Sequence, residues 1–336
     1  RDSFTMDKSK YLRLDANERV IPFSKKEINE FIKVVKDFYL QSYPLERKKI
    51  ISKLAKMEKI NLNEISITPG ADTSLKYLFE IFSSRKGVVA TIYPTYGMVD
   101  VYAKIYSKRL LKIYEDQVEF FNDLKNYQNI AFIYLANPNS PIGDYKTIDE
   151  IKPLLDTGIP VLIDEAYIEF LDTEDIHWNS FIKYIDEYPN LLVTRTFSKG
   201  FGAAGCRVGM TFGHKDMIEP LSKFRQMYEI TGVSLKYCEF LLYNHHLVDI
   251  YCQEVIEEKK KVISMLKDYE VIDSNCNWIH FNNQDDNKKT KEILDKHKVL
   301  VKYCKIHPYG KRDNWCRMTI QPKLSEQDFF KELVNG

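Results

Sequence analysis

The sequence predicts an α/β protein: a three-layer αβα large domain with a mainly parallel sheet, and a smaller α+β domain. Between residues 65 and 213, short apolar runs alternate with segments in helical spacing. This alternation is typical of a parallel sheet with helices on both faces. Beyond residue 270, shorter strand and helix patterns follow one another less regularly. The length of 336 residues agrees with two domains, at roughly 150 residues per domain.

The elements follow from local spacing. Residues 25–40 carry Ile28, Phe31, Ile32 and Val35 on one helical face, and a second helix is expected over 46–58. The alternating region predicts strands at 65–70, 87–94, 109–114, 130–138, 160–167, 191–198 and 206–213. The helices expected from there to residue 228 are 73–84, 96–106, 118–127, 146–155, 178–188 and 217–228.

The last third of the chain marks the domain boundary. Residues 233–268 form one long, mostly helical stretch that would connect two domains. Beyond it, the pattern predicts strands at 269–274, 277–281, 299–304 and 316–320, and helices at 288–297 and 326–334. We therefore expect a large domain at 40–245, and a small domain that combines 1–39 with 246–336.

Composition excludes several classes of protein. The chain has 49 Lys and Arg against 48 Asp and Glu, so no excess of positive charge favours nucleic-acid binding. The longest apolar runs are too short to span a membrane. The six cysteines are scattered without a C-x-x-C pair, which fits neither a metal site nor a disulfide scaffold. The N-terminal residues are polar and lack the apolar core of a signal peptide, so we expect a cytoplasmic protein.

The most informative segment surrounds Lys199, which directly follows a strand and lies in a loop of small residues. A lysine becomes a nucleophile where its surroundings lower its pKa, and Schiff-base chemistry is the usual purpose. Ser198 and Arg207 flank it with groups that bind anions. The glycines of this loop also spell G-x-G-x-x-G, which would suggest a nicotinamide oxidoreductase. The fingerprint requires a helix after the glycines, whereas residues 206–213 predict a strand.

A second candidate site is the end of the strand at 160–167, where Asp164 and Tyr167 follow a buried apolar run. In open α/β sheets, ligands bind beyond the carboxyl ends of the strands. Asp164 could hold a protonated ring nitrogen and Tyr167 could hydrogen-bond a phenolic oxygen. The alternatives are a strand-end cap or a metal carboxylate, and no histidine lies nearby in the sequence to support a metal.

Two further turns follow strands. Residues 136–143 read A-N-P-N-S-P-I-G, a rigid polar turn. Residues 69–74 read P-G-A-D-T-S and lead from a strand into a helix, whose first N–H groups form a phosphate cradle. The alternative for this second turn is an ordinary helix cap.

Taken in order, these motifs resemble a known family. G-A-D, P-T-Y-G, N-P-N-x-P-x-G, D-E-A-Y, S-K-x-x-x-x-A-G-x-R and a late R-x-T are similar to those of fold-type I pyridoxal-phosphate (PLP) aminotransferases of class I/II. The histidinol-phosphate aminotransferase-like branch is the most similar, and the resemblance runs from Leu14 to Thr319.

The resemblance implies a role for each matching residue. Lys199 would bind the cofactor covalently, while Asp164 and Tyr167 would contact its ring nitrogen and its ring hydroxyl. Arg317 would clamp a substrate carboxylate, beside the substrate-binding residues Asn17 and Tyr228. The remaining cofactor-binding positions would be Gly70, Ala71, Asp72, Ser198 and Arg207 at the phosphate, Tyr96 on the ring face, and Tyr43, which would reach the neighbouring subunit's cofactor.

The sequence departs from the family pattern at three places, one of which is Glu18-Arg19 in place of a Glu-Asn pair near the entrance of the site. Ser140 replaces an asparagine, so either Asn139 or Ser140 would face the ring oxygen. Glu229 replaces another asparagine in the wall on the substrate side. The expected enzyme is a homodimer with shared active sites and no metal, which transfers an amino group between an amino acid, with glutamate preferred, and a small phosphorylated oxo compound. The alternative is a PLP-dependent decarboxylase of a phosphorylated amino acid, of the phosphoserine or phosphothreonine type.

Overall fold

The computed structural model describes residues 7–35, 41–44, 47–114, 129–173, 180–282, 287–304 and 315–335. The chain divides into two compact units. The large unit contains Ser24–Glu169 and Thr173–Val248, and the small unit contains Arg1–Phe23, Phe170–Asp172 and Asp249–Gly336.

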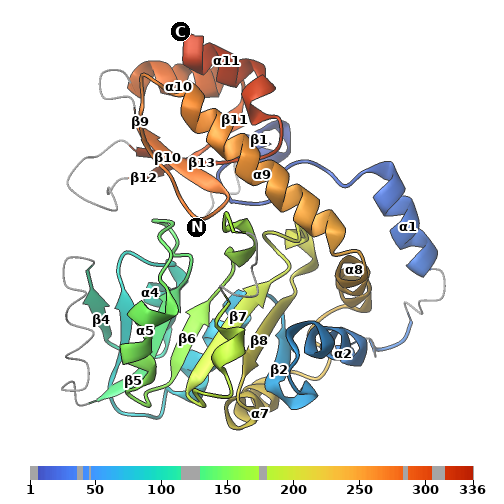
Figure 1. The fold of residues 1–336 in the computed structure, drawn as a ribbon, viewed down its shortest axis with the longest axis vertical. Coiled ribbons are helices and arrows are strands. Elements are labelled where there is room, and N and C mark those ends of the chain that lie inside the picture. Colours follow the sequence, from blue (N-terminus) through green and yellow to red (C-terminus); the bar gives the residue numbers. More distant parts are fainter. Residues whose placement is uncertain are drawn as a thin grey trace. The chain divides into compact units, whose positions relative to one another are not determined.

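A seven-stranded sheet forms the centre of the large unit, in the order β2-β8-β7-β6-β5-β3-β4 (Figure 1). Its strands are β2 (Ile65–Thr68), β3 (Val88–Ile92), β4 (Leu110–Ile113), β5 (Ile130–Ala136), β6 (Val161–Asp164), β7 (Leu191–Thr196) and β8 (Gly209–Gly213). Strand β8 is antiparallel to both of its neighbours, and the other pairs are parallel. The predicted α/β class with a mainly parallel sheet is therefore confirmed.

Helices cover this sheet because its strands are apolar on both faces, as in other parallel sheets. Every residue of β2, β6, β7 and β8 is buried. Leu75, Leu78 and Phe79 of α3 belong to the same core cluster as Phe132 of β5. The helices of the large unit are α1 (Lys25–Val35), α2 (Arg47–Glu58), α3 (Ala71–Ile81), α4 (Met98–Ile105), α5 (Ile148–Leu155), α7 (Lys215–Phe224) and α8 (Gly232–Tyr243). Its short 3-10 turns are η2 (Leu62–Glu64), η4 (Ile168–Phe170), η5 (Phe181–Tyr184) and η6 (Ala204–Cys206).

The topology brings several strand ends to one edge of the sheet. Strands β3, β5, β6 and β7 are parallel, and β2 has the same direction because β8 is antiparallel to both β2 and β7. In the ladders, Ala136 pairs with Asp164, and Asp164 pairs with Thr194. The segments that follow β2, β5, β6 and β7 therefore emerge at the same edge.

The small unit is built on an antiparallel sheet in the order β12-β13-β10-β9, with β1 and β11 as a separate parallel pair. Its core contains Trp278 and Trp315, which are fully buried. The N-terminal segment joins this unit because Leu12 pairs with Val299. The elements are η1 (Lys8–Lys10), β1 (Leu12–Arg13), β9 (Glu270–Ile272), β10 (Trp278–Asn282), α10 (Asn287–Lys296), β11 (Val299–Leu300), β12 (Lys302–Cys304), β13 (Trp315–Thr319), η7 (Leu324–Glu326) and α11 (Asp328–Asn335).

The structure differs from the expected elements in five places. The strand expected at 299–304 is two strands, β11 and β12, which belong to different sheets. Helix α1 packs in the large unit rather than with the small domain, because Phe31 contacts Tyr237 with ring centroids 4.7 Å apart. The long stretch 233–268 is two helices, α8 and α9 (His246–Met265), separated at Asn244, whose side chain caps the Phe240 carbonyl. Helix α7 ends at Phe224, before the predicted residue 228. Over 180–188, η5 replaces the predicted helix, and the helix expected at 118–127 lies outside the described residues.

Candidate active site

Asp164 is the last residue of β6 and lies at the edge where the strand ends meet. Its side chain is buried, and each carboxylate oxygen accepts one hydrogen bond. The Tyr134 hydroxyl donates to Oδ2 at 2.8 Å, and the Ala166 backbone N–H donates to Oδ1 at 3.1 Å. Burial raises the pKa of Asp164 to about 6, against the lowering effect of these two hydrogen bonds. Asp164 can therefore hold a cationic ring nitrogen at neutral pH.

Lys199 lies in the loop directly after β7, and its ammonium nitrogen is 5.4 Å from the centroid of the Tyr167 ring. The loop is closed by backbone hydrogen bonds, from the Gly202 N–H to the Lys199 carbonyl (2.8 Å) and from the Ala203 N–H to the Phe197 carbonyl (2.8 Å). A side chain at Gly200 would place its Cβ 2.6 Å from the Cβ of Glu169, so this position is restricted to glycine. The structure thus brings the predicted Lys199 and Tyr167 together.

Tyr96 lies near the same groups. Its hydroxyl donates to Asp72 at 3.3 Å, and Tyr102 donates to the other Asp72 oxygen at 2.8 Å. Burial raises the pKa of the Tyr96 phenol, and the negative charges of Asp72 and Asp164 raise it further. The predicted residues Tyr96, Asp72 and Asp164 are therefore electrostatic neighbours in one site.

An anion cradle is formed where β2 passes into α3. Gly70 has φ +82°, and a Cβ there would lie 2.8 Å from Nη2 of Arg207. Arg207, itself at φ +53°, donates from Nη1 to the Ser198 hydroxyl at 3.3 Å. Helix α3 begins at Ala71, and the N–H groups of a first helical turn have no partners within the helix. A cation, a hydroxyl and a helix N-terminus therefore surround one position, as a phosphate group requires.

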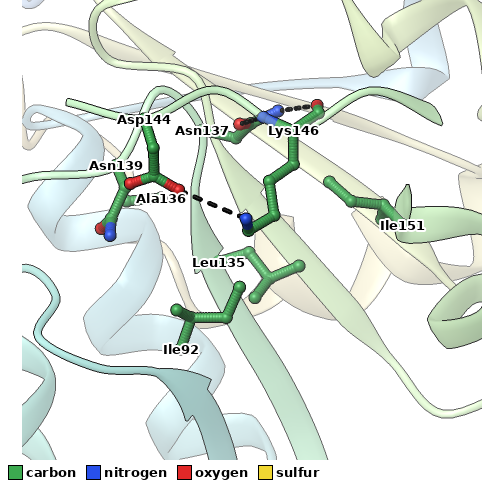
Figure 2. Close-up of a pocket in the computed structure, with 8 residues that line it drawn as sticks. All are labelled: Ile92, Leu135, Ala136, Asn137, Asn139, Asp144, Lys146 and Ile151. Atoms are coloured by element: carbon green, nitrogen blue, oxygen red, sulfur yellow. Dashed lines mark hydrogen bonds and ion pairs between the residues drawn. The ribbon is translucent and has the colours of Figure 1, made fainter. Parts of the chain in front are cut away.

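The turn after β5 contains Asn139 and Ser140, one of which was expected to face the cofactor ring. The Asn139 amide donates to the Pro94 carbonyl at 3.2 Å, and its backbone N–H donates to the Asp144 carbonyl at 2.8 Å. Asn139 lines a small cavity of about 10 Å³. Lys146 and Asp144, whose charged groups are 3.5 Å apart, line the same cavity (Figure 2). Ser140 is partly exposed. The choice between Asn139 and Ser140 stays a prediction.

The same turn is closed by Asn137 and Lys146. The Asn137 side chain donates to the Lys146 carbonyl at 2.8 Å and accepts from the Lys146 backbone N–H at 2.7 Å. These two bonds appear as dashed lines in Figure 2. The turn therefore has a fixed shape where it leaves the sheet.

Tyr43 and Tyr228 stack with ring centroids 4.2 Å apart and an interplanar angle of 17°. They are 71% and 45% exposed, respectively. Next to Tyr228, Glu229 accepts a hydrogen bond from the Tyr77 hydroxyl at 2.7 Å and lies 3.8 Å from a guanidinium nitrogen of Arg47. The glutamate that departs from the family pattern is thus held by two partners within the large unit.

Asn17 and Arg317 belong to the small unit, whereas the other predicted site residues belong to the large unit. Asn17 has φ +55°, and its side-chain oxygen accepts a hydrogen bond from the Thr319 hydroxyl at 3.1 Å. Arg317 lies on β13, where Nη2 donates to the Asp15 carbonyl at 3.4 Å and the guanidinium lies 5.2 Å from the Trp278 ring centroid. The structure brings Asn17 and Arg317 into one region through the Thr319 and Asp15 contacts.

Two groups of residues were missed by the sequence reasoning. Tyr134 and Tyr102 donate to the site carboxylates, and the detectable signal is that a buried tyrosine needs a partner for its hydroxyl. The second group is a buried charge cluster around Arg195, which lies 2.9 Å from Glu165 and 3.2 Å from Glu58. Buried Glu169 adds to this cluster, and burial raises its pKa to about 7.

The residues present fit a pyridoxal phosphate. The cradle at Gly70 and Arg207 suits its phosphate, Asp164 suits its ring nitrogen, and Lys199 is the amine for its aldehyde. Within the described ranges, no cluster of acidic, histidine or cysteine side chains could hold a metal ion. In the same ranges, no helix has both the length and the apolar character to cross a membrane.

This fold and this site define the class of fold-type I PLP enzymes. The chain belongs to the family described as aminotransferase class I and II, which matches residues 10–333, and its cofactor is pyridoxal phosphate. Within that family it lies in the histidinol-phosphate aminotransferase-like branch. It is 32% identical to the histidinol-phosphate aminotransferase of Flavobacterium psychrophilum, over 99% of this chain and 92% of that protein.

Solved structures share this fold. The histidinol-phosphate aminotransferase from Sinorhizobium meliloti, in complex with pyridoxal-5'-phosphate, superposes with a TM-score of 0.81 at 18% identity, covering 99% of this chain and 93% of that one. The L-threonine-O-3-phosphate decarboxylase from Porphyromonas gingivalis superposes with a TM-score of 0.78 at 18% identity, covering 96% and 98%. One fold therefore supports both chemistries.

Proposed function

We propose that this aminotransferase moves an amino group between an amino acid, with glutamate as donor, and a small phosphorylated oxo compound. The observation that carries the proposal is that Lys199, 5.4 Å from the Tyr167 ring, and the buried carboxylate of Asp164 both follow strands that end at the same edge of the sheet. The similarity to a histidinol-phosphate aminotransferase supports a phosphorylated substrate.

Each side chain has a task in this proposal. When bound, pyridoxal phosphate supplies an electron sink for the electrons released at the substrate Cα. Asp164 would keep a proton on its ring nitrogen, and Tyr167 would hydrogen-bond its ring hydroxyl. With the cofactor bound, the Lys199 amine would be the group that accepts and donates the proton moved at the substrate Cα. Arg317 binds the substrate carboxylate through paired N–H groups, which fixes its orientation.

A PLP-dependent decarboxylase of a phosphorylated amino acid is the second candidate. The observation in its favour is Glu229, a charged residue that Tyr77 and Arg47 hold and that replaces an asparagine of the family pattern. Residues on the substrate side would orient the substrate against the bound cofactor, so a changed side chain in this wall could change which substrate bond is broken. This candidate is supported by the similar fold of the L-threonine-O-3-phosphate decarboxylase from Porphyromonas gingivalis.

Glutamate without an acceptor separates the two candidates. The aminotransferase predicts that glutamate converts the bound cofactor to its amine form, with loss of the aldehyde absorption and release of 2-oxoglutarate in equal amount. The decarboxylase predicts an unchanged spectrum with glutamate and release of carbon dioxide from O-phosphoserine or O-phosphothreonine.

The substrate class is tested by comparing phosphate esters with their free alcohols as acceptors. Equal kcat/KM for the ester and the alcohol would contradict a phosphorylated substrate.

The proposed enzyme is a homodimer that shares its active sites. Large side chains of the described large unit are exposed around the stacked tyrosines: Met227 is 72% exposed and Tyr43 is 71% exposed. Exposed apolar groups that gather in one place are typical of a protein interface. Sedimentation equilibrium should give twice the 39.6 kDa chain mass, and a monomer with full activity would contradict the shared site.

The cysteines support a reducing compartment, such as the cytoplasm, as the place of action. All six are free thiols, and Cys238, Cys252, Cys276 and Cys316 are buried. Buried free thiols are usual in proteins that stay reduced.

A further inference from the structure

Tyr134 is a buried residue of β5 that has no role in the proposed reaction steps. Its hydroxyl donates to Oδ2 of Asp164 at 2.8 Å, and its side chain is 0% exposed. The ladder pairs Tyr134 with Leu162, so Tyr134 lies two rungs before Asp164 on the same face of the sheet. Two residues span about 6.6 Å along a strand. The tyrosine side chain is long enough to bridge this distance, whereas phenylalanine has no hydroxyl that could donate to Asp164.

The hydroxyl remains protonated under all working conditions, because burial raises the pKa of the Tyr134 phenol well above its ordinary value. It is therefore a donor toward Asp164. An ionised carboxylate has about four lone-pair positions on its two oxygens. Tyr134 and the Ala166 N–H occupy one position on each oxygen, which leaves capacity for a further donor.

We infer that Tyr134 is a positioning residue: its hydroxyl fixes the Asp164 carboxylate so that the free lone pairs meet the N–H of the cofactor ring. The inference rests on the proposed role of Asp164. Hydrogen bonds to charged groups are stronger than those between neutral groups. A carboxylate with one donor on each oxygen is also restricted in rotation, so the binding geometry exists before the cofactor arrives.

The surrounding charges make this donor important. Asp164 lies near Asp72 from α3 and near the Tyr96 phenol, and Glu165 is the next residue of the chain. The negative charges of Asp72 and Glu165 raise the pKa of Asp164, as burial does. The Tyr134 hydroxyl on β5 and the Ala166 N–H lower it. Without the hydroxyl, Asp164 would bind a proton at a higher pH. A neutral carboxyl cannot pair with a protonated ring nitrogen, so cofactor affinity would be lost at a higher pH.

The test uses the apo-enzyme titrated with pyridoxal phosphate between pH 5 and 8.5, followed by equilibrium dialysis. Tyr134→Phe should bind the cofactor about tenfold more weakly at pH 7, and the pH at which affinity is half lost should rise by about one unit. Tyr106→Phe is the matched control, because its hydroxyl donates to Glu80 at 3.4 Å. It should change the affinity less than about twofold.

A double-mutant cycle distinguishes positioning from a general structural effect. In an Asp164→Ala background, Tyr134→Phe should add less than about a twofold loss of affinity, since its partner is gone. An equal loss in both backgrounds would overturn the inference.

If Tyr134→Phe does not fold, 3,5-difluorotyrosine at position 134 keeps the shape and is a stronger donor. It should lower the pH midpoint, and an unchanged or raised midpoint would overturn the inference.

The same preparations separate this inference from the proposed function. Borohydride reduction of the wild-type holoenzyme followed by peptide mapping reports whether Lys199 carries the cofactor. If Lys199 carries the label but the Tyr134 and Asp164 substitutions reduce cofactor affinity additively, only the positioning role of Tyr134 is contradicted. A label absent from Lys199 defeats the proposed function, whatever the cycle gives.

Discussion

Asp164 and Glu165 are consecutive buried carboxylates, and their surroundings give them different tasks. Successive side chains of a strand point to opposite faces of the sheet. On one face, Asp164 is held by the neutral donors Tyr134 and Ala166. On the other, Glu165 accepts from Arg195 at 2.9 Å, from Ser180 at 2.9 Å and from the Phe181 N–H at 2.7 Å.

The difference teaches which buried carboxylate remains available for a ligand. Glu165 is neutralised by a cation of the protein itself, so its charge contributes to the fold. Asp164 has its charge stabilised by dipoles, so it can still accept a cation from outside. Two adjacent carboxylates therefore differ in role: Glu165 belongs to a structural ion pair, and Asp164 is a binding group.

Arg195→Met should produce the largest change, in stability. Arg195 is 8% exposed and contacts Glu165 and Glu58, so its removal leaves buried carboxylates without their cation. Removal of one partner of a buried pair costs about 3–5 kcal/mol, which urea unfolding of the apo-protein measures. The control Lys223→Ala removes an exposed pair with Glu219 and should cost less than about 1 kcal/mol. Equal losses for the two variants would contradict a structural role for the Arg195 cluster.

Asp164→Asn should change function rather than stability. The amide keeps the size of the side chain but loses the charge that holds a proton on the ring nitrogen. We expect kcat/KM to fall by on the order of 10²–10³, and the unfolding free energy of the apo-protein to change by less than about 1 kcal/mol. Glu165→Gln is the matched comparison. It should lower the unfolding free energy more than Asp164→Asn does, and cofactor affinity less than Asp164→Asn does. The reverse pattern would show that the two carboxylates had been assigned to the wrong tasks.

Gly70→Ala should give the smallest of these effects. It tests whether the cofactor phosphate binds at the cradle formed by Gly70 and Arg207. The new Cβ would meet Arg207 at 2.8 Å, at a φ of +82° that alanine tolerates poorly. Gly158 has a similar φ of +72° but open space around it. Both substitutions should cost about 1 kcal/mol of stability, while Gly70→Ala alone should weaken the binding of pyridoxal phosphate. An equal effect of both variants on cofactor affinity would contradict the binding of the cofactor phosphate at Gly70 and Arg207.

Much of this site could be predicted from the sequence, because its residues directly follow apolar strands. Lys199 and Asp164 were found this way, since strand ends of a parallel sheet meet at one edge. Tyr134 could not be found, because it lies inside a strand where a buried aromatic residue usually means core packing. Arg195 was missed for a similar reason, as its partner Glu58 is distant in the sequence.

The fold shows the same limit. Alternation of apolar strands and helices predicted the sheet, but local spacing could not assign α1 to the large unit. That assignment depends on the contact of Phe31 with Tyr237, two residues that are far apart along the chain. Likewise, the break between α8 and α9 depends on one capping asparagine, Asn244, within an otherwise continuous helical pattern.

The most direct test of the central claim is the identity of the amine that carries the cofactor. The purified holoenzyme is reduced with borohydride, digested and mapped by mass spectrometry. The account predicts a single pyridoxyl-labelled peptide with the label on Lys199, and no labelling of a Lys199→Arg variant. A label on another lysine, or an unlabelled protein that retains aminotransferase activity, would contradict it.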